Sequence, residues 1–433
     1  MKKIIHNLSL IALALVFGIT SWGCSSKTSD FNFTNNSNID RTDEPIVLSR
    51  DMIVDKMGGI GIIENQIPVP YYADGNAIPS QLDDIDMDGE WDELAFTLDI
   101  PANQTKEVSI RFMDIDELPE FESRTNVRFG VLVNQGVQPV SHLILTANEL
   151  PVPLFERFQM DGPAWENDLV GFRQYIDGRN GRDLYGKTSP EMALDTVGIS
   201  DEGTLEDNYH VMLPWGRDIL AVGNSLGLGG LAIINNGEVV RLGVRMDAER
   251  NNVDITEYQL IKEGPVRSIF RLTYKGWDIG DEKITLTNDV IIWAGKYSHI
   301  NKVKLSETET TDTLVVGLVN IHNDNAPVLL EETGTEYSAF YTHDKQTYDK
   351  GWFLGMGLIF PSEPYAGFME APDSGPGVTN SFLNYFELDE NKSLEYHVIA
   401  GWELSDENFS NPDYFNEFIT KEIQKISTPV LID

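Results

Sequence analysis

Alternation of apolar and polar residues is the most regular feature of this sequence, and it predicts a protein built from β-strands. Between 266 and 274, the odd and even positions separate into the two faces of a half-buried strand. Further strand-like segments, divided by turns rich in Gly and Asn, occupy 231–234, 239–244, 283–292, 299–305 and 314–320. Many such strands and few helical patterns predict an all-β fold, with residues 116–433 forming a large antiparallel β-sandwich.

A second group of short strands precedes this region and predicts a separate small domain. Strand patterns occur at 46–48, 93–98 and 107–112, the last of them directly after the turn at 101–104. We expect residues 46–115 to form an N-terminal β-sandwich domain. Residues 115–125 read as a connector, and the segments 127–133 and 139–145 lead into the large domain.

One helix is predicted, at the C-terminal end of the large domain. Phe415, Phe418, Ile419, Ile423 and Ile426 recur at helical spacing. The preceding Asn-Pro-Asp at 411–413 supplies a start signal. We expect this helix to pack on the large sandwich.

The first 45 residues read as a targeting segment and a tether rather than part of the fold. Two lysines precede an apolar run at 8–19 that is too short to span a membrane stably, so residues 1–23 are predicted to be a signal peptide. Cys24 is the single cysteine of the chain and follows this run directly, which favours lipidation. Residues 24–45 are rich in Ser, Thr and Asn and predict a flexible tether. The protein is therefore expected to be exported and lipid-anchored at the outer membrane, facing the periplasm or the cell surface.

Net charge narrows the range of partners. The chain carries a formal charge of −37 at pH 7, a field that repels nucleic acids and anionic membrane surfaces. We expect no nucleic-acid partner, and contact with a membrane only through the lipid anchor. An anionic polysaccharide would also be repelled unless a local group of basic residues captured it.

The segment 161–187 concentrates the candidate chemistry. Most of its residues are Gly, Pro, Asn, Trp or charged, yet Val170, Phe172 and Ile176 predict a short strand through the middle. Carboxylates, amides, arginines and an aromatic face are the groups that bind sugars. The alternative is a network of structural ion pairs and turns, since Asp-Gly and Asn-Gly are ordinary turn signals. The candidate residues are Trp165, Glu166, Asn167, Arg173, Tyr175, Asp177, Asn180 and Asp183.

This segment also carries a family resemblance. Trp-Glu-Asn-Asp at 165–168, then Gly-Phe-Arg, then Asp-Gly-Arg-Asn-Gly-Arg-Asp-Leu-Tyr-Gly-Lys at 177–187 resemble a family of exported bacterial proteins encoded in polysaccharide-utilisation loci. That family has been known as a domain of unknown function, and the resemblance runs from about residue 44 to the C-terminus. It implies carbohydrate processing, since some proteins of such loci are described as dehydratases or lyases acting on uronic-acid-containing oligosaccharides. The large domain also resembles the giant sandwich of galactose mutarotases and several polysaccharide lyases.

An acidic loop in the N-terminal region is a candidate metal site. Its spacing, D-x-D-x-D-G, converges alternate acids on one hard cation while Gly permits the turn. We expect a structural calcium ion here, with an acidic surface turn as the alternative. The candidate ligands are Asp84, Asp86, Asp88, Glu90 and Asp92. No phosphate-binding Gly loop and no cysteine-based metal motif is present in the sequence, and no organic cofactor is expected.

A second cluster of candidate residues lies at 208–218. His210 is the candidate proton acceptor, and Tyr209 is a weaker one, because neighbouring residues on a strand face opposite ways unless the backbone bends. Trp215 and Arg217 follow within the same cluster. His322 lies in a polar turn and is a further candidate for the same cleft.

These observations lead to three hypotheses of function. The leading one is a lyase or dehydratase that removes the proton next to a uronate carboxylate, with His210 as base, Arg173 and Arg217 holding the carboxylate, and both tryptophans stacking on rings. Glu166 and Asn167 would bind hydroxyls. The second is a glycoside hydrolase using Glu166 with Asp177 or Asp183. The third is a glycan-binding lipoprotein without catalytic activity. In all three the partner is an oligosaccharide or polysaccharide.

Overall fold

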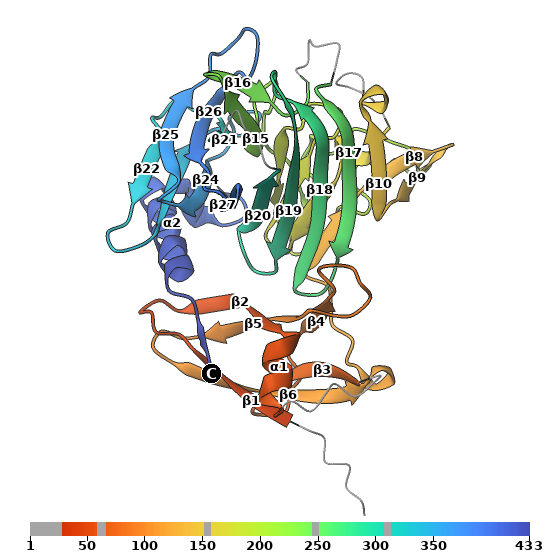
Figure 1. Ribbon diagram of the computed structural model, residues 1–433, viewed down its shortest axis with the longest axis vertical. Helices are drawn as coiled ribbons and strands as arrows, with labels where there is room; N and C mark the ends of the chain where they lie inside the picture. Colours follow the sequence, from red (N-terminus) through yellow and green to blue (C-terminus); the bar gives the residue numbers. More distant parts are fainter. Residues whose placement is uncertain (1–27, 59–65, 151–156, 245–250, 307–312) are drawn as a thin grey trace, which may run out of the picture.

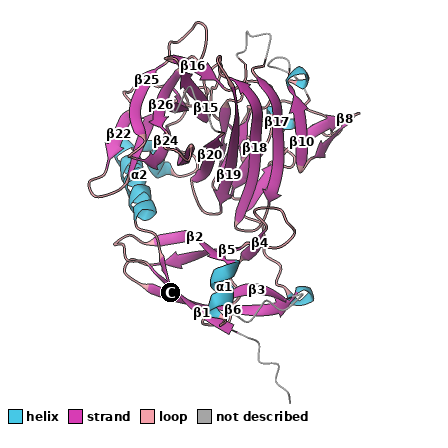
Figure 2. Ribbon diagram, in the orientation of Figure 1, coloured by secondary structure: helices cyan, strands magenta, loops and turns pink. Residues whose placement is uncertain are grey.

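The computed structural model describes residues 28–58, 66–150, 157–244, 251–306 and 313–433, which form two lobes (Figure 1). The predicted signal peptide and Cys24 lie outside the described residues. Figure 2 shows that strands dominate both lobes. Among the residues described, no helix is long and apolar enough to cross a membrane. The predicted all-β architecture is confirmed.

The small lobe consists of two packed sheets. A four-stranded sheet has the order β28-β1-β6-β3, and a three-stranded sheet has the order β2-β5-β4. Their facing side chains, among them Phe33, Leu48, Phe96 and Ile110, are fully buried between them. The elements of this lobe are β1 (Thr28–Thr34), β2 (Arg41–Ser49), α1 (Arg50–Lys56), β3 (Gln66–Tyr72), β4 (Ser80–Asp83), β5 (Glu93–Ile100), β6 (Thr105–Asp114), a 3-10 helix at Ile115–Glu117 and β28 (Leu431–Ile432).

The expected tether at 24–45 is wrong for its described part. Residues 28–34 form β1, which pairs with β6 along its whole length, and 41–45 belong to β2. The many polar residues of β1 face outwards, whereas Phe31 and Phe33 alternate into the core. Two aromatic side chains two positions apart were enough to place this polar segment in a sheet.

The large lobe is a sandwich in which one long sheet covers two shorter ones. The nine-stranded sheet has the order β10-β17-β18-β19-β20-β27-β24-β23-β22, and all its neighbouring strands are antiparallel. Opposite it lie two five-stranded sheets, β14-β13-β12-β11-β7 and β16-β15-β21-β26-β25, joined by a bridge between Arg182 and Gly227. The main core fills the space between these layers.

Each segment of the large lobe predicted as a strand falls on observed strands, but about half of the strands of this lobe, among them all those after residue 320, were not predicted. Its first strands are β7 (Thr125–Arg128), β8 (Gly130–Val133), β9 (Gly136–Pro139), β10 (His142–Thr146), β11 (Ala164–Asn167), β12 (Val170–Gln174), β13 (Arg182–Lys187), β14 (Gly216–Asp218), β15 (Leu228–Asn235), β16 (Glu238–Arg241) and β17 (Val253–Lys262). The later ones are β18 (Arg267–Asp278), β19 (Lys283–Trp293), β20 (Ser298–Leu305), β21 (Thr313–Val319), β22 (Val328–Glu331), β23 (Tyr337–Asp344), β24 (Leu354–Pro361), β25 (Tyr365–Glu370), β26 (Ser381–Glu387) and β27 (Ser393–Trp402). Short 3-10 helices occupy Ala147–Glu149, Gln159–Asp161 and Glu407–Ser410.

The predicted C-terminal helix is α2 (Pro412–Ser427). Asn411 caps it by accepting from the backbone N–H of Asp413, and Pro412 occupies its first turn. Its apolar side packs on the outer face of the nine-stranded sheet through Phe415, Ile419 and Ile423. The chain then crosses to the small lobe, where β28 pairs with β1. The small lobe therefore does not end at residue 115, as expected, but includes the C-terminal strand.

Buried and half-buried ion pairs join the two lobes. Arg267 of β18 donates from Nε to Asp83 of β4 at 2.8 Å and from NH2 to Glu93 of β5 at 2.6 Å. Arg124, in the connector, bridges Asp43 of the small lobe and Asp168 of the large lobe at 2.6 Å each. Because each arginine bonds two carboxylates in fixed geometry, the lobes are held in one relative orientation.

Candidate functional site

The β14-β13-β12-β11-β7 sheet has one apolar and one charged face. On β12, Phe172 faces the main core, where its ring lies 5.8 Å from that of Trp165. Arg173 is the next residue and faces the other way, directly across from Asp183 of β13. The predicted strand through Phe172 is confirmed as β12, and Arg173 and Tyr175 lie on one side with Phe172 buried on the other.

Arg173 is the centre of a buried polar network on the charged face. Its guanidinium donates to Asp183 Oδ2 from Nε at 2.9 Å and to Asp218 Oδ2 from NH2 at 2.8 Å. NH1 donates to the Tyr209 hydroxyl at 2.9 Å, and NH2 also donates to the Tyr175 hydroxyl at 2.7 Å. Burial alone would lower the pKa of Arg173, but the surrounding tyrosines and carboxylates raise it well above its usual value.

This network corrects the role expected for Arg173. Its side chain is 2% exposed and its N–H groups are engaged with protein acceptors. A substrate carboxylate could reach it only by displacing Asp183 or Asp218. Arg173 therefore positions other residues and is not a carboxylate clamp, while burial and the charge of Asp218 raise the pKa of Asp183.

Three neighbouring candidates on β11 are structural. Trp165 is fully buried in the main core, so it cannot stack on a sugar. Glu166 is buried on the charged face, where Lys187 donates to it and the backbone N–H groups of Ala193 and Leu194 donate at 2.6 and 2.8 Å. Asn167 donates to two backbone carbonyls and accepts from the turn at 169–170. The expected sugar contacts of Trp165, Glu166 and Asn167 are wrong, because Trp165 is enclosed in the core and the polar atoms of Glu166 and Asn167 are bonded inside the fold.

The remaining candidates of the segment are also enclosed. Asp177 is fully buried and pairs with Arg179 at 2.7 Å, and the Arg179 guanidinium lies 3.9 Å from the centre of the Tyr175 ring. Asn180 is 2% exposed in a left-handed turn, with φ of 50°. The predicted glycoside hydrolase pairs, Glu166 with Asp177 or with Asp183, are therefore wrong, because none of these carboxylates faces solvent. The alternative interpretation, a network of structural ion pairs and turns, describes most of 161–187.

His210 occupies the open edge of this network. Its Nδ1 lies 3.3 Å from Oδ2 of buried Asp218, and its Nε2 lies 3.2 Å from Oδ1 of exposed Asp207. The hydrogen bond with Asp218 is the main cause of a raised pKa for His210. Residues 206–209 are not in a strand, and the rings of Tyr209 and His210 lie 4.8 Å apart. The backbone bend that these two residues needed in order to share one site is therefore present.

A cavity of about 240 Å³ opens beside Tyr209. Asp161, Glu206 and Asp207 contribute carboxylates to its wall. Burial raises the pKa of Asp161, and Arg173, whose NH1 lies 3.7 Å away, opposes that shift. Met160 and Asp161 both have left-handed backbone conformations, with φ of 54° and 61°. Such conformations in non-glycine residues concentrate at functional sites.

The other candidates of the second cluster lie around His210 to different degrees. Arg217 is nearly buried and pairs with Asp349 at 3.0 Å. Trp215 is half-buried, with its ring edge-on to Tyr185 at 5.8 Å. His322 is half-buried in the turn after β21, and no contact found in the described part of the chain joins it to the His210 cluster. Arg217 therefore contacts Asp349, the neighbour of Tyr348 in the chain, and Trp215 contacts Tyr185 of the charged face, whereas His322 is not brought to this region.

The structure adds residues that the sequence did not indicate. Asp218 was part of the cluster at 208–218, but only its position behind His210 gives it a role. Tyr348 comes from the loop between β23 and β24, is 55% exposed, and has its ring stacked at 6.2 Å from that of His210. Its backbone N–H donates to the Ile219 carbonyl at 2.7 Å. No spacing in the sequence connects Tyr348 with His210.

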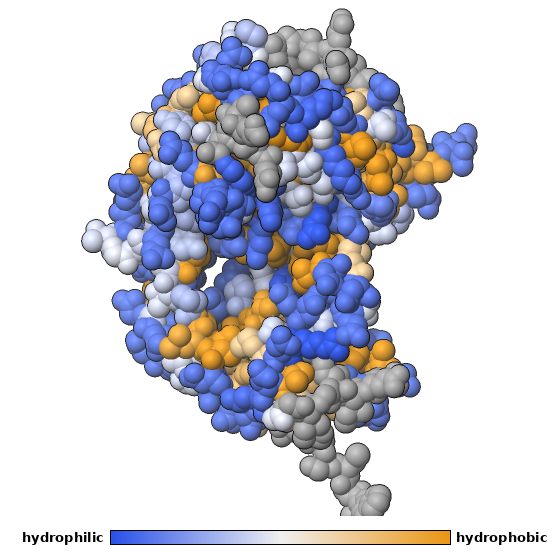
Figure 3. All heavy atoms as spheres, viewed as in Figure 1, coloured by the Kyte–Doolittle hydropathy of each residue, from blue (hydrophilic) through white to orange (hydrophobic). Residues whose placement is uncertain are grey.

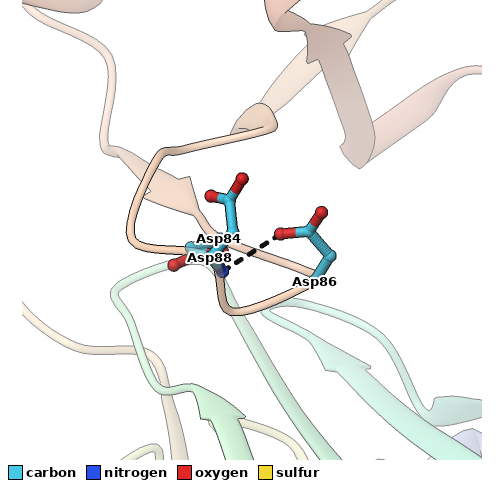
Figure 4. A group of neighbouring side chains, drawn as sticks. All are labelled: Asp84, Asp86 and Asp88. Atoms are coloured by element: carbon cyan, nitrogen blue, oxygen red, sulfur yellow. Dashed lines mark hydrogen bonds between the residues drawn. The ribbon is translucent and has the colours of Figure 1, made fainter.

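The acidic loop lies in the small lobe and is shown in Figure 4. One carboxylate oxygen from each of Asp84, Asp86 and Asp88 lies within 4.8 Å of the others, as a shared cation would require. Glu90 instead pairs with Arg50, and Asp92 accepts from the backbone N–H of Ile85 at 2.7 Å. The fit to calcium therefore rests on three carboxylates, and the side chains of Glu90 and Asp92 are used elsewhere.

Comparison with known proteins identifies the family. The model of the family described as "Domain of unknown function (DUF4861)" matches residues 33–432. The chain belongs to this family. A relative from Formosa agariphila, "Uncharacterized protein P7", is 24% identical over 368 residues, covering 82% of this chain and 80% of the relative.

Solved structures give weaker likenesses. The chain is similar to an α-mannosidase from Enterococcus faecalis V583 (TM-score 0.46, 9% identity) and to a glycosyl hydrolase family 38 protein from Enterococcus faecalis (TM-score 0.47, 8% identity). These likenesses cover 94% of this chain, which spans about half of each of those proteins, 46% and 47%. A putative aldose 1-epimerase from Klebsiella pneumoniae matches at a TM-score of 0.30 and 8% identity, covering 70% of this chain and 97% of that protein. At these TM-scores the likenesses carry no argument about activity.

Proposed function

We propose that this protein is a carbohydrate-active enzyme that performs an elimination on uronic-acid-containing oligosaccharides, as a lyase or dehydratase. The observation that supports this proposal is the contact of His210 with buried Asp218, together with its ring contact with Tyr209, which lines an open cavity. A carboxylate at Nδ1 fixes the orientation of an imidazole, and Nε2 would exchange a proton with a substrate that displaces the exposed carboxylate of Asp207 from it.

The proposed step uses His210 and Tyr209 in opposite roles. Neutral His210 takes the proton from the carbon next to the substrate carboxylate, and the electron pair forms a carbon–carbon double bond. The C–O bond on the adjacent carbon breaks, and the leaving oxygen takes a proton from the Tyr209 hydroxyl. Burial is the main cause of a raised pKa for Tyr209, so this hydroxyl holds its proton until the leaving group accepts it.

The substrate carboxylate is assigned to the Arg217 end of the site. Asp161, Glu206 and Asp207 make the cavity wall acidic and would repel an anion, whereas they accept well from sugar hydroxyls. Arg217 donates through Nε to the Asp218 carbonyl and through NH1 to Asp349. The NH2 group of Arg217 takes part in no hydrogen bond found within the described residues, so it is available to a substrate carboxylate.

Product analysis tests this proposal. The protein is incubated with a panel of uronate-containing oligosaccharides, and the products are followed by ultraviolet absorbance and mass spectrometry. An elimination yields an absorbing unsaturated uronate, and a dehydratase also yields a loss of water. His210→Ala should lose at least about a hundredfold in rate. His142→Ala is the matched control, because His142 is also exposed and paired with a carboxylate, Glu257, at 3.0 Å.

A glycoside hydrolase is the second candidate, with new residues in place of those first expected. Asp161 and Asp207 line the same cavity, and the raised pKa of Asp161 suits a general acid. New reducing ends without ultraviolet absorbance, abolished by Asp161→Asn, would establish hydrolysis and overturn the elimination. Absence of any product across the panel would overturn both in favour of glycan binding alone.

A further inference from the structure

A second and larger cavity, of about 470 Å³, lies between the two lobes. Its walls come from β2 of the small lobe, from β19, β20, β23 and β27 of the nine-stranded sheet, and from α2 with the residues that follow it. Figure 3 shows an opening between the lobes with apolar side chains along its lower border. This interlobe cavity shares no lining residue with the cavity beside Tyr209.

The interlobe cavity is held open by contacts on both of its sides. On one side, Arg267 ties the nine-stranded sheet to Asp83 and Glu93. On the other side, Arg41 of β2 donates to the Lys425 carbonyl at the end of α2 at 3.1 Å, and β28 completes the small-lobe sheet. A cavity whose walls are fixed before binding loses little conformational entropy when a ligand enters.

One part of the lining is apolar and aromatic. Trp293 of β19 and Tyr337 of β23 contribute rings, and Ile46, Ile291 and Ile300 contribute aliphatic surface. Flat aromatic and aliphatic surfaces of this kind pack against the C–H face of a pyranose ring.

The other part of the lining can exchange hydrogen bonds with hydroxyl groups. Glu44 and Lys296 lie 3.6 Å apart, and Glu422 and Lys425 lie 2.7 Å apart, so most of the charge is internally neutralised. Burial lowers the pKa of His397, which therefore stays neutral and can both donate and accept.

The pairing of charges argues against an anionic ligand. Both lysines of the lining are already paired with carboxylates, Lys296 with Glu44 and Lys425 with Glu422, and the third carboxylate, Glu395, pairs with Lys302 at 3.5 Å. A phosphate, sulfate or uronate would have to displace one of these carboxylates, whereas a neutral polyhydroxyl ligand would find acceptors and donors together.

From these observations, we propose that the interlobe cavity is a second ligand site and that it binds a neutral saccharide unit of a glycan. It would hold the glycan independently of the His210 site. The inference does not rest on the elimination proposed above, because it uses no residue of that site.

Calorimetry on the full chain tests the inference. Neutral oligosaccharides, such as those of galactose, xylose and rhamnose, are titrated into the wild type and two variants. Ser298→Trp fills the interlobe cavity from the first position of β20, and Ser393→Trp makes the same change at an exposed position at the start of β27. At least one neutral ligand should bind the wild type, and Ser298→Trp should weaken that binding at least tenfold. Ser393→Trp and His210→Ala should bind as the wild type does.

Two results would overturn the inference. One is that no neutral saccharide in the panel binds the wild type. The other is that Ser298→Trp binds normally while its circular dichroism is unchanged. If Ser298→Trp does not fold, Tyr337→Ala replaces it, with the same tenfold loss expected and unchanged binding as the contradicting outcome. If the wild type binds a neutral saccharide but does not turn over any uronate oligosaccharide, the proposed elimination is wrong and the inference about the interlobe cavity stands.

Discussion

The Nδ1 atom of His210 lies 3.3 Å from Oδ2 of Asp218, and the same carboxylate oxygen accepts from the guanidinium of Arg173. An imidazole at the edge of the fold is thereby connected to a buried ionic network. Changes in the charge of His210 should therefore affect the stability of the fold.

Stability should depend on pH through His210. Because its folded pKa is raised, the pair with Asp218 contributes stability that is complete below the unfolded pKa of about 6.5 and is lost as the pH rises through the folded pKa. The destabilisation caused by His210→Ala should therefore be largest in acid and should shrink as the pH rises. Urea unfolding of the wild type and of His210→Ala between pH 5 and pH 9 measures this pH dependence. Asp207 and Arg173 are the other charged groups near the imidazole ring.

Asp218→Asn should lower the pKa of His210, which can be followed directly by NMR titration of the imidazole. In the elimination, the acidic limb of the pH–rate profile should move to lower pH in this variant. An unchanged imidazole pKa would contradict the contact as drawn.

Removing Arg173 should lower the stability of the protein more than its catalytic activity. Arg173→Met leaves Asp183 and Asp218 buried without their shared cation, and it should cost about 3–5 kcal/mol in the free energy of unfolding. Arg271 is the control, because it also pairs with an aspartate, Asp289, at 2.6 Å, but its side chain is 33% exposed. Arg271→Met should cost no more than about 1 kcal/mol. Equal costs in denaturant titrations would show that burial of the Arg173 network contributes nothing.

Tyr348 should contribute to binding rather than to chemistry. Tyr348→Ala removes an exposed ring next to His210 and should raise KM about threefold to tenfold with little change in kcat. Tyr348→Phe should retain most of the affinity, because the ring remains. Tyr72, 37% exposed in the small lobe, supplies the control substitution Tyr72→Ala. A fall in kcat at constant KM would contradict a role in binding.

We propose that calcium binds the loop of Asp84, Asp86 and Asp88 and stabilises the small lobe. A chelator should lower the melting temperature of the wild type, and Asp86→Ala with Asp88→Ala should abolish that effect. Calcium at a hundredfold excess over its dissociation constant would contribute about 3 kcal/mol. Replacing two acids of the exposed 3-10 helix, Asp116→Ala with Glu117→Ala, is the control and should leave the chelator effect intact. Melting that is indifferent to chelator would reduce the loop to a turn.

We propose that Cys24 carries a lipid anchor. Cys24→Ser should move the protein from the membrane fraction to the soluble fraction, because one thiol is the only attachment point for the anchor. Ser26→Ala, two residues further on, should stay with the membranes. Fractionation followed by immunoblotting measures both, and membrane retention of Cys24→Ser would refute lipidation.

The strands were predictable where burial imposes a period of two, as it does along much of β18 and β19. Alternation also puts Arg173 and Phe172 of β12 on opposite faces, but this strand is buried on both of them. Alternation could not show that Arg173 faces a covered surface, because that depends on residues 188–215 folding back over the sheet. Local composition therefore made a buried ionic network resemble the wall of an open cleft.

Other residues of the site depend on contacts between distant segments. Tyr348 reaches His210 through a loop more than a hundred residues later in the chain. Trp165 was misjudged because a short strand between turns does not reveal which of its two faces is covered. The segment 28–45 was misjudged because its polar residues outnumber the two phenylalanines that bury themselves.

Phe33 of β1 pairs with Ile432 of β28, two residues separated by nearly the full length of the chain. Closing so long a loop is entropically costly, and contacts of this range slow folding. The four-stranded sheet of the small lobe therefore gains its edge strand, β28, only after synthesis has passed Ile432. Until then its outer backbone groups stay unpaired, and the incomplete small lobe is the stage at which this protein is most exposed to aggregation and proteolysis.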